Sequence, residues 1–234
     1  ATVKQVYDQI IKDIDNACQM LESPDKSGLY ISKHENSRLN KYSVNGIKAR
    51  ICLVLEDWSG ALEASKIAQE GSNIGTNDDI FNGINDITRQ NVIWGADIYR
   101  DEASTNPTFF AHVDHNAGSY ASSSLKVINK ELYNHMSNSD VRRYWWNSDY
   151  SNNKHKYADP RDMYRYNYIW MRHEEMVLIE AEAECRLGNY NVACSVLERL
   201  VKTRDVNYSC NKTGTSLGTL TTDKTGSLLE EIIM

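Results

Sequence analysis

The chain has 234 residues and a mass of 26.7 kDa, a size that fits one large domain or two small ones. Its formal net charge is −6, and no cluster of Lys and Arg resembles a surface that follows nucleic-acid phosphates, which argues against nucleic acid as a partner. Fourteen tyrosines and five tryptophans accompany only three phenylalanines. Because Tyr and Trp combine an apolar ring with a polar group, this bias favours a binding function.

The five cysteines form an odd set without the CxxC spacing of a metal site. Cys18, Cys52, Cys185 and Cys194 fall on predicted helices, where we expect them to pack as small apolar side chains. Cys210 lies in a loop-like stretch, and we expect no disulfide framework in a helical domain of this size. No apolar run has the ~18 residues of a membrane-spanning helix. The N-terminus lacks a signal-peptide core, which fits either a cytosolic protein or one whose export signal was removed.

The first seventy residues carry the apolar spacing of three helices, which we place at 3–21, 43–56 and 58–70. Residues 91–94 then predict a short strand. Residues 95–124 form a long polar stretch that contains several aromatic side chains. Loops beyond ~12–15 residues are usually binding loops or disordered, and the aromatics argue against disorder. We therefore predict a binding loop.

The second half begins with a predicted helix at 125–136, followed by an irregular or short-stranded, aromatic-rich region at 144–170. A helical hairpin starts at Met171, and Gly188 separates its two helices because glycine adopts the positive φ of a helix end without steric cost. Residues 213–227 predict a loop, and a new helical pattern begins at Ser227.

The two helical hairpins share one pattern of residues. Ala49 and Ala181 are equivalent positions, Trp58 matches Tyr190, and Ala61 matches Ala193. These are tetratricopeptide-like offsets, but Trp58 and Tyr190 are 132 residues apart, which excludes a tandem array of ~34-residue repeats. We infer that an insert separates the hairpins. The alternative is that two unrelated hairpins share a common pattern of small and aromatic residues.

Four segments in chain order resemble the SusD/RagB-like outer-membrane glycan-binding lipoproteins of Gram-negative bacteria. The first is a helix with the sequence KQVYDQIIKDIDNA from Lys4, and the second is RLNKYSVNGIKARICLVLEDWSGA from Arg38. SDVR from Ser139 and WMRHEEMVLIEAEAECRLG from Trp170 follow. The resemblance runs from Lys4 to Asp205, and residues 230–233 are similar to the start of the next helix of the family.

The resemblance implies a mainly α fold, in which tetratricopeptide-like hairpins form a SusD-like superhelix with a long irregular insert containing short strands. We expect one SusD-like domain over 1–234. Its parts are the first helices and hairpin (3–72), the aromatic-rich insert (73–170), the second hairpin (171–205), and a loop with a truncated helix (206–234). Family members carry further residues on both sides, including a lipid-modified cysteine. We therefore expect a fragment whose membrane attachment depends on a lipid anchor missing from this chain.

The function implied is non-catalytic binding of an oligosaccharide at the outward-facing side of the outer membrane. The family delivers its glycan to a TonB-dependent SusC-like transporter, which the helices would face. Two alternatives stay open. One is a tetratricopeptide module that binds a protein and no glycan. The other is an α-helical glycoside-processing enzyme, which needs two carboxylates ~5–10 Å apart beside a groove.

Candidate glycan-binding residues combine aromatic rings, which cover the C–H faces of sugars, with polar groups that bind hydroxyls. The family's ligand aromatics often come from the insert, so our first set is Asp97, Tyr99, Arg100, Asp101, Asn106, Phe109, Phe110, His112 and Tyr120. The second set is Trp145, Trp146 and Tyr150. A competing interpretation places four other aromatics in the core between the hairpins and loops: Trp94, Tyr164, Tyr166 and Trp170.

No catalytic motif is present, and we assign no catalytic residue, metal or cofactor. The segment 112–115 contains two histidines and an aspartate, but a short cluster in a polar loop is more often solvated than a ligand set. The helix from His173 begins like a zinc-protease helix yet lacks the second histidine. We interpret the charges of Arg172 and Glu175, and those at 180, 182 and 184, as a solvated helix face with i,i+3 pairing.

Overall fold

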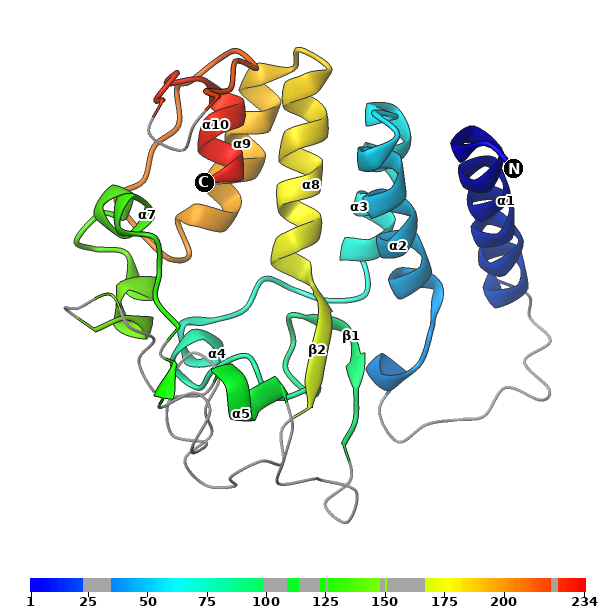
Figure 1. The fold of residues 1–234 in the computed structure, drawn as a ribbon, viewed down its shortest axis with the longest axis horizontal. Coiled ribbons are helices and arrows are strands. Elements are labelled where there is room, and N and C mark those ends of the chain that lie inside the picture. Colours follow the sequence, from blue (N-terminus) through cyan, green and yellow to red (C-terminus); the bar gives the residue numbers. More distant parts are fainter. Residues whose placement is uncertain are drawn as a thin grey trace.

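A computed structural model of the chain describes residues 1–22, 35–98, 109–113, 123–124, 126–147, 150, 167–219 and 223–234. Its elements are α1 (Val3–Glu22), η1 (Glu35–Ser37), α2 (Lys41–Val54), α3 (Trp58–Gln69), α4 (Asn77–Phe81), β1 (Val92–Ala96), α5 (Phe109–Val113), α7 (Lys130–His135), η2 (Val141–Trp145), β2 (Tyr168–Arg172), α8 (His173–Arg186), α9 (Tyr190–Val201) and α10 (Leu228–Ile233). Helices α1, α2, α3, α8, α9 and α10 form one layer, α4, α5, β1 and β2 lie along its lower edge, and α7 lies at the side next to α9 and α10 (Figure 1).

Local signals define the first hairpin. Asn40 caps α2 by accepting from the backbone N–H of Ser43 at 2.9 Å, and the Ser43 hydroxyl accepts from the N–H of Asn40 at 2.8 Å. Asp57 caps α3 by accepting from the N–H of Gly60 at 2.9 Å. Ala49 and Ala61 are fully buried in the core, which lets α2 and α3 approach closely.

The second hairpin repeats this design. Gly188 adopts a φ of +84° and donates its N–H to the carbonyl of Cys185 at 3.0 Å, which ends α8. Ala181 and Ala193 are fully buried, like their counterparts in the first hairpin. Helix α8 packs against α3, so hairpins that lie far apart in sequence are neighbours in space (Figure 1). The expected mainly α architecture of tetratricopeptide-like hairpins is confirmed.

The start of the second hairpin differs from the prediction. Met171 belongs to β2, and helix α8 begins two residues later at His173. β2 pairs antiparallel with β1, with Val92 opposite Arg172, and the N–H of His173 donates to the carbonyl of Asn91 at 2.9 Å. Met171 is nevertheless 1% exposed because it packs into the core below α2. An apolar residue at a strand end and one on a helix face give the same sequence pattern.

Two apolar clusters form the core. One joins α8, α9 and α10, and the other joins α2, α3, β1, β2 and α8. Cys52 and Cys185 are buried thiols, as expected, and burial raises the pKa of Cys52 to about 11. The described part of the middle segment holds a helix shorter than expected, because α7 spans only Lys130–His135. Among the described residues, no helix combines the length and the apolar character needed to cross a bilayer.

The expectation about Cys194 and Cys210 is wrong. Cys194 and Cys210 form a disulfide, with their Cα atoms 5.3 Å apart. The segment after α9 turns back along that helix, and the N–H of Cys210 donates to the Glu198 side chain at 2.7 Å. The turn of this segment brings Cys210 next to Cys194 of α9, which the apolar sequence pattern alone had assigned to the core.

Candidate functional site

Four aromatic side chains at the β1–β2 sheet and the adjoining helix α5 form what we call the aromatic surface: Trp94, Phe109, Tyr168 and Trp170. Trp94 and Trp170 meet edge to face with centroids 4.6 Å apart, and Phe109 and Tyr168 do so at 6.1 Å. Tyr168 and Trp170 point to the same face of β2 because side chains alternate along a strand. Trp170 is 47% exposed and Phe109 is 48% exposed. Large exposed rings can cover the C–H face of a ligand.

Polar groups hold the base of this surface. Asn167 donates to a carboxylate oxygen of Asp97 at 3.0 Å, and its own side-chain oxygen accepts from the N–H of Ile87 at 3.0 Å. The guanidinium of Arg50 donates to the carbonyl of Trp170 at 2.7 Å and also forms an ion pair with Glu175 at 2.6 Å. The strand that carries Trp170 is thereby fixed both to the loop before β1 and to helix α2.

The structure brings part of the first candidate set to this surface. Phe109 belongs to it, His112 lies exposed on the same short helix α5, and Asp97 follows β1. Phe110 also lies in α5, but its side chain is outside the described part. The other members of the set lie outside the described residues: Tyr99, Arg100, Asp101, Asn106 and Tyr120.

The competing core interpretation fails for Trp170 and holds in part for Trp94. Trp94 is half-buried and packs against the core of the first hairpin. Trp170 is nearly half exposed, so the sequence reasoning missed it as a site candidate. The alternation of Tyr168, Trp170 and Arg172 with Ile169 and Met171 is the strand signal that could have found it. Tyr164 and Tyr166 lie outside the described residues.

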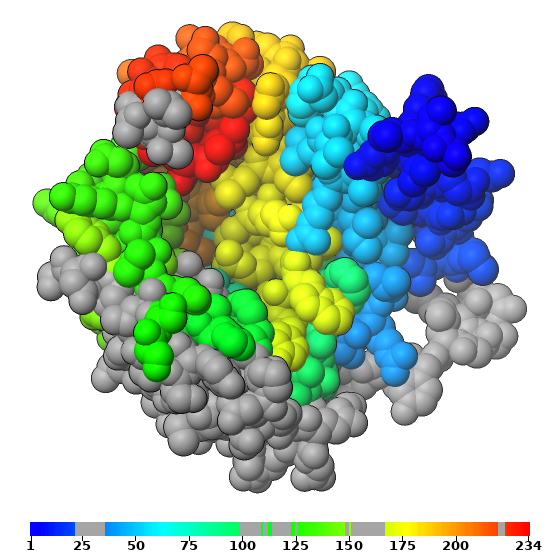
Figure 2. Space-filling model, viewed as in Figure 1, coloured from blue at the N-terminus to red at the C-terminus, as the bar shows by residue number. Residues whose placement is uncertain are grey.

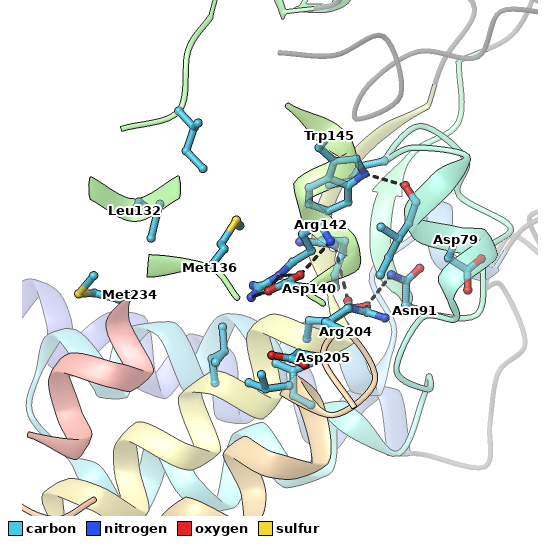
Figure 3. A pocket seen from close by; sticks show the side chains of 18 of the residues that line it. Asp79, Asn91, Leu132, Met136, Asp140, Arg142, Trp145, Arg204, Asp205 and Met234 are labelled. Carbon is cyan, nitrogen blue, oxygen red and sulfur yellow. Dashed lines mark hydrogen bonds and ion pairs between the residues drawn. The ribbon is translucent and has the colours of Figure 1, made fainter. Parts of the chain in front are cut away.

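The second candidate set lies elsewhere, at a pocket with a volume of about 500 Å³. The pocket lies between α8, α9 and α10 on one side and α4, η2 and α7 on the other, and this face of the molecule is hollowed between α8 and the α7–η2 segment (Figure 2). Trp145 and Trp146 line it. The indole N–H of Trp145 donates to the carbonyl of Ile80 at 2.7 Å (Figure 3). Tyr150 instead packs edge to face on Tyr133.

Glu174 and Arg204 form an ion pair at 2.9 Å in the wall of this pocket. Each is about 6% exposed. Glu174 also accepts from Asn91 at 2.8 Å and from the N–H of Gly75 at 3.1 Å, and Arg204 donates to the carbonyl of Gly75 at 2.7 Å. The desolvation of Arg204 lowers its pKa, which the neighbouring Glu174 opposes.

The expectation of a solvated charged helix face is wrong for Glu180 and Glu184 of α8. Glu174, Glu180 and Glu184 are buried, with exposures of 5–6%. Their partners come from other helices: Arg199 of α9 binds Glu180 at 2.7 Å, and Lys66 of α3 lies 3.4 Å from Glu184. Helix α8 lies between α3 and α9, so its carboxylates become the connection between the two hairpins.

Other charges at the pocket are also paired. Asp79 binds Arg89 at 3.1 Å. Asp140 binds Arg142 at 2.6 Å (Figure 3). Asp205 accepts from the hydroxyls of Ser137 and Ser139, and these bonds lower its pKa. Within the described ranges, no group of three or more His, Cys, Asp or Glu side chains could hold a metal ion.

Solved structures show which class of protein has this architecture. A SusD-like carbohydrate-binding protein from Bacteroides vulgatus matches all of this chain with a TM-score of 0.73 at 22% identity, over 48% of its own length. A SusD superfamily protein from Bacteroides thetaiotaomicron has a TM-score of 0.67 at 16% identity, with 88% of this chain and 48% of its own covered. One from Bacteroides fragilis has a TM-score of 0.66 at 17% identity, covering 100% and 50%.

The chain therefore has the SusD-like fold, and the resemblance drawn from its sequence is confirmed. It spans about half the length of the solved structures it matches, which agrees with the expectation of a fragment. No family model matches the sequence, and no curated protein matches it.

Proposed function

We propose that this chain is the glycan-binding part of a SusD-like protein that captures oligosaccharides at the outer surface of the cell. The capture is non-catalytic, and the glycan passes to a TonB-dependent SusC-like transporter in the outer membrane. Attachment to that membrane would use a lipid anchor outside this chain. The single observation that carries the proposal is the aromatic surface, presented on the two-stranded sheet beside the polar groups of Asp97 and Asn167.

The aromatic surface suits a sugar for two reasons. Trp170 and Phe109 expose nearly half of their area, so a pyranose ring can pack on them and remove apolar surface from water. Trp94 packs edge to face on Trp170, and Tyr168 does so on Phe109. Because these contacts restrict the two exposed rings, less side-chain conformational entropy is lost when a ligand binds. The insert residues Tyr99, Arg100, Asp101, Asn106 and Tyr120 complete the proposed site.

The carboxylates support a non-catalytic role. A glycosidase needs a general acid whose pKa is raised towards neutrality. Within the described part of the chain, each carboxyl group with a clearly shifted pKa is shifted downward, including Asp79, Asp205 and Glu231. Hydrogen bonds or cations hold these groups ionised, which suits structure rather than proton donation.

The helices provide the proposed transporter-facing surface. A groove of about 350 Å³ lies between α2, α8 and α10, lined by Leu53, Val54, Leu178 and Ile233. Val54 and Ile233 are 64% and 55% exposed. Exposed apolar side chains beside a groove are typical of protein interaction sites. The same observation would serve the alternative function, a tetratricopeptide module that binds a protein without glycan.

A glycan array tests the proposal. We expect the chain to bind at least one oligosaccharide class, and Trp170→Ala to weaken that binding about 10-fold or more, because a sugar–aromatic contact is lost. Tyr144→Ala is the matched control, since Tyr144 is also 47% exposed but lies on η2 beside Phe81. A folded chain that binds no glycan yet captures a SusC-like protein would favour the interaction module.

A further inference from the structure

We propose that Arg50 of helix α2 is a positioning residue of the aromatic surface, because it holds the backbone that carries Trp170 and so sets the orientation of that exposed ring. The inference rests on the proposed capture of glycan at this surface. It adds a residue that acts through Trp170 and needs no contact with the ligand. Arg50 lies 120 residues before Trp170 in the chain, so the folded structure alone brings the two together.

The guanidinium of Arg50 bonds to two residues at once. Its Nη2 atom donates to the carbonyl oxygen of Trp170 at 2.7 Å. Its Nε and Nη2 atoms donate to the Oε1 and Oε2 atoms of Glu175, at 2.6 and 2.7 Å. Two parallel bonds to one carboxylate fix the plane of a guanidinium, which a single bond would leave free to rotate. Glu175 therefore holds Arg50 in the orientation in which it reaches the Trp170 carbonyl.

The pairing of β1 with β2 passes over Trp170. Within these two described strands, Ile169 and Met171 each have a partner on β1, and Trp170 between them has none. A residue that a ladder passes over has unpaired backbone groups, and the strand bends there. The bond from Arg50 gives the Trp170 carbonyl a partner outside the ladder. Arg50 thus supplies a backbone restraint that β1 does not supply at this residue.

The two residues that Arg50 joins lie on either side of the boundary between β2 and α8. Trp170 belongs to the strand, and Glu175 belongs to the first turn of the helix. One guanidinium therefore restrains the angle at which the strand meets the helix. Trp94 contacts the indole of Trp170 itself, with the ring centroids 4.6 Å apart. Loss of Arg50 would keep this ring contact but release the backbone, so more conformational entropy would be lost when a glycan orders the indole.

The indole N–H signal of Trp170 tests the inference by NMR without any ligand. We expect Arg50→Met to shift and broaden that signal, because the ring samples more orientations. Arg186→Met is the matched control. Arg186 forms an ion pair with Glu182 at 3.1 Å and lies over the ring of Trp58, so the Trp58 signal should change and the Trp170 signal should not. A Trp170 signal that is the same in the native chain and in Arg50→Met would overturn the proposal.

Oligosaccharide affinity shows whether Arg50 acts through Trp170. For the strongest oligosaccharide of the array, we expect Arg50→Met to weaken binding about 5-fold in the native chain. In a chain that already carries Trp170→Ala, we expect a further loss of less than about 2-fold. Equal losses in the two chains would overturn the proposal, since Arg50 would then act without Trp170. A native chain that binds no oligosaccharide overturns the proposed function instead, and the ligand-free signal then decides whether Arg50 orients Trp170.

Arg50→Lys separates positioning from charge, and it serves as the test if Arg50→Met does not fold. A lysine keeps the positive charge beside Glu175, but it has no planar fork that bonds to a carboxylate and a carbonyl together. We expect Arg50→Lys to show most of the affinity loss and most of the change in the Trp170 signal. Native affinity and a native Trp170 signal in the lysine variant would overturn the proposal and leave Arg50 with a role of charge alone.

Discussion

Glu174 connects several segments of the chain through one carboxylate. Arg204, Asn91 and the backbone of Gly75 all donate to its Oε1 atom, at 2.9, 2.8 and 3.1 Å. These donors come from the segment after α9, the residue before β1 and the loop after α3. A single buried side chain at the start of α8 therefore holds the sheet against the helical layer.

We expect Glu174→Ala to lower the free energy of unfolding by about 3–5 kcal/mol, because it leaves the buried Arg204 without its counter-charge. Glu175→Ala is the matched control on the next residue. Its pair with Arg50 is more than one-third exposed, so the loss should be below about 1 kcal/mol. Urea unfolding of both variants measures the difference. Equal losses would show that burial of the pair does not matter.

Asp205 makes the free energy of unfolding depend on pH. Hydrogen bonds from Ser137 and Ser139 lower its folded pKa below the ordinary value near 3.9. The stabilisation is thus complete at pH values above the unfolded pKa, and it is lost as pH falls through the lower folded pKa. We expect the free energy of unfolding of the native chain to decrease below about pH 4. For the Asp205→Asn variant we expect a smaller decrease over the same pH range. Chemical denaturation at a series of pH values measures this difference. Equal decreases in the native chain and in the Asp205→Asn variant would contradict this role of Asp205.

Single residues also show where sequence reasoning reaches its limit. The small residues Ala49, Ala61, Ala181 and Ala193 could be placed in the hairpin interfaces because helix periodicity fixes their direction. The exposure of Trp170 could not be predicted, because it depends on whether a neighbouring segment covers that face of β2. Periodicity assigns a face to a residue, but tertiary packing decides what lies against it.

The segment that follows α9 joins α9 to α10 by a disulfide and by hydrogen bonds. The Cys194–Cys210 disulfide fixes it to α9, while Tyr208 and Lys212 bind the Glu231 side chain of α10 at 3.1 and 2.6 Å. Burial opposes ionisation of Glu231, but Lys212 and Tyr208 outweigh it and lower its pKa. Helix α10 is thus held by charged contacts as well as by the core.

Reduction of the disulfide should destabilise the chain by about 3 kcal/mol, the loop-closure value for about 15 residues, close to the separation of 16 here. The measurement is urea unfolding with and without dithiothreitol. Cys210→Ser should match the reduced protein and lose its response to the reductant. A native chain that is insensitive to reductant would contradict this role.

Helices α1, α2 and α3 could be predicted to within two residues at each end, because each has its own apolar spacing and end signals, whereas α4 and α5 were not predicted and α7 is shorter than the helix expected at 125–136. Helix α1 was expected at 3–21 and spans Val3–Glu22, and α3 was expected at 58–70 and spans Trp58–Gln69. The boundary between β2 and α8 and the disulfide were missed. Both depend on segments distant in sequence, β1 for the strand and α9 for Cys210.

In the whole molecule, the helical layer and the sheet have different proposed roles. Packed hairpins form a scaffold (Figure 1), and the pocket lies beside α8 (Figure 2). The sheet carries the aromatic surface. The two separated hairpins of the sequence pattern predicted the helical scaffold, but neither the aromatic surface on the sheet nor the pocket. The exact residues of a glycan site were not predictable, because the insert has no period that fixes where its side chains point.

The central claim is that glycan binds at the aromatic surface, and the five indole N–H signals of the chain test it most directly. Each signal would be assigned by a Trp→Phe variant and followed by NMR while the strongest oligosaccharide from the array is added. We predict shifts at Trp94 and Trp170, with none at Trp58, which lies on α3 under the guanidinium of Arg186. Shifts at Trp58 with Trp94 and Trp170 unchanged would contradict the account and place binding on the helices.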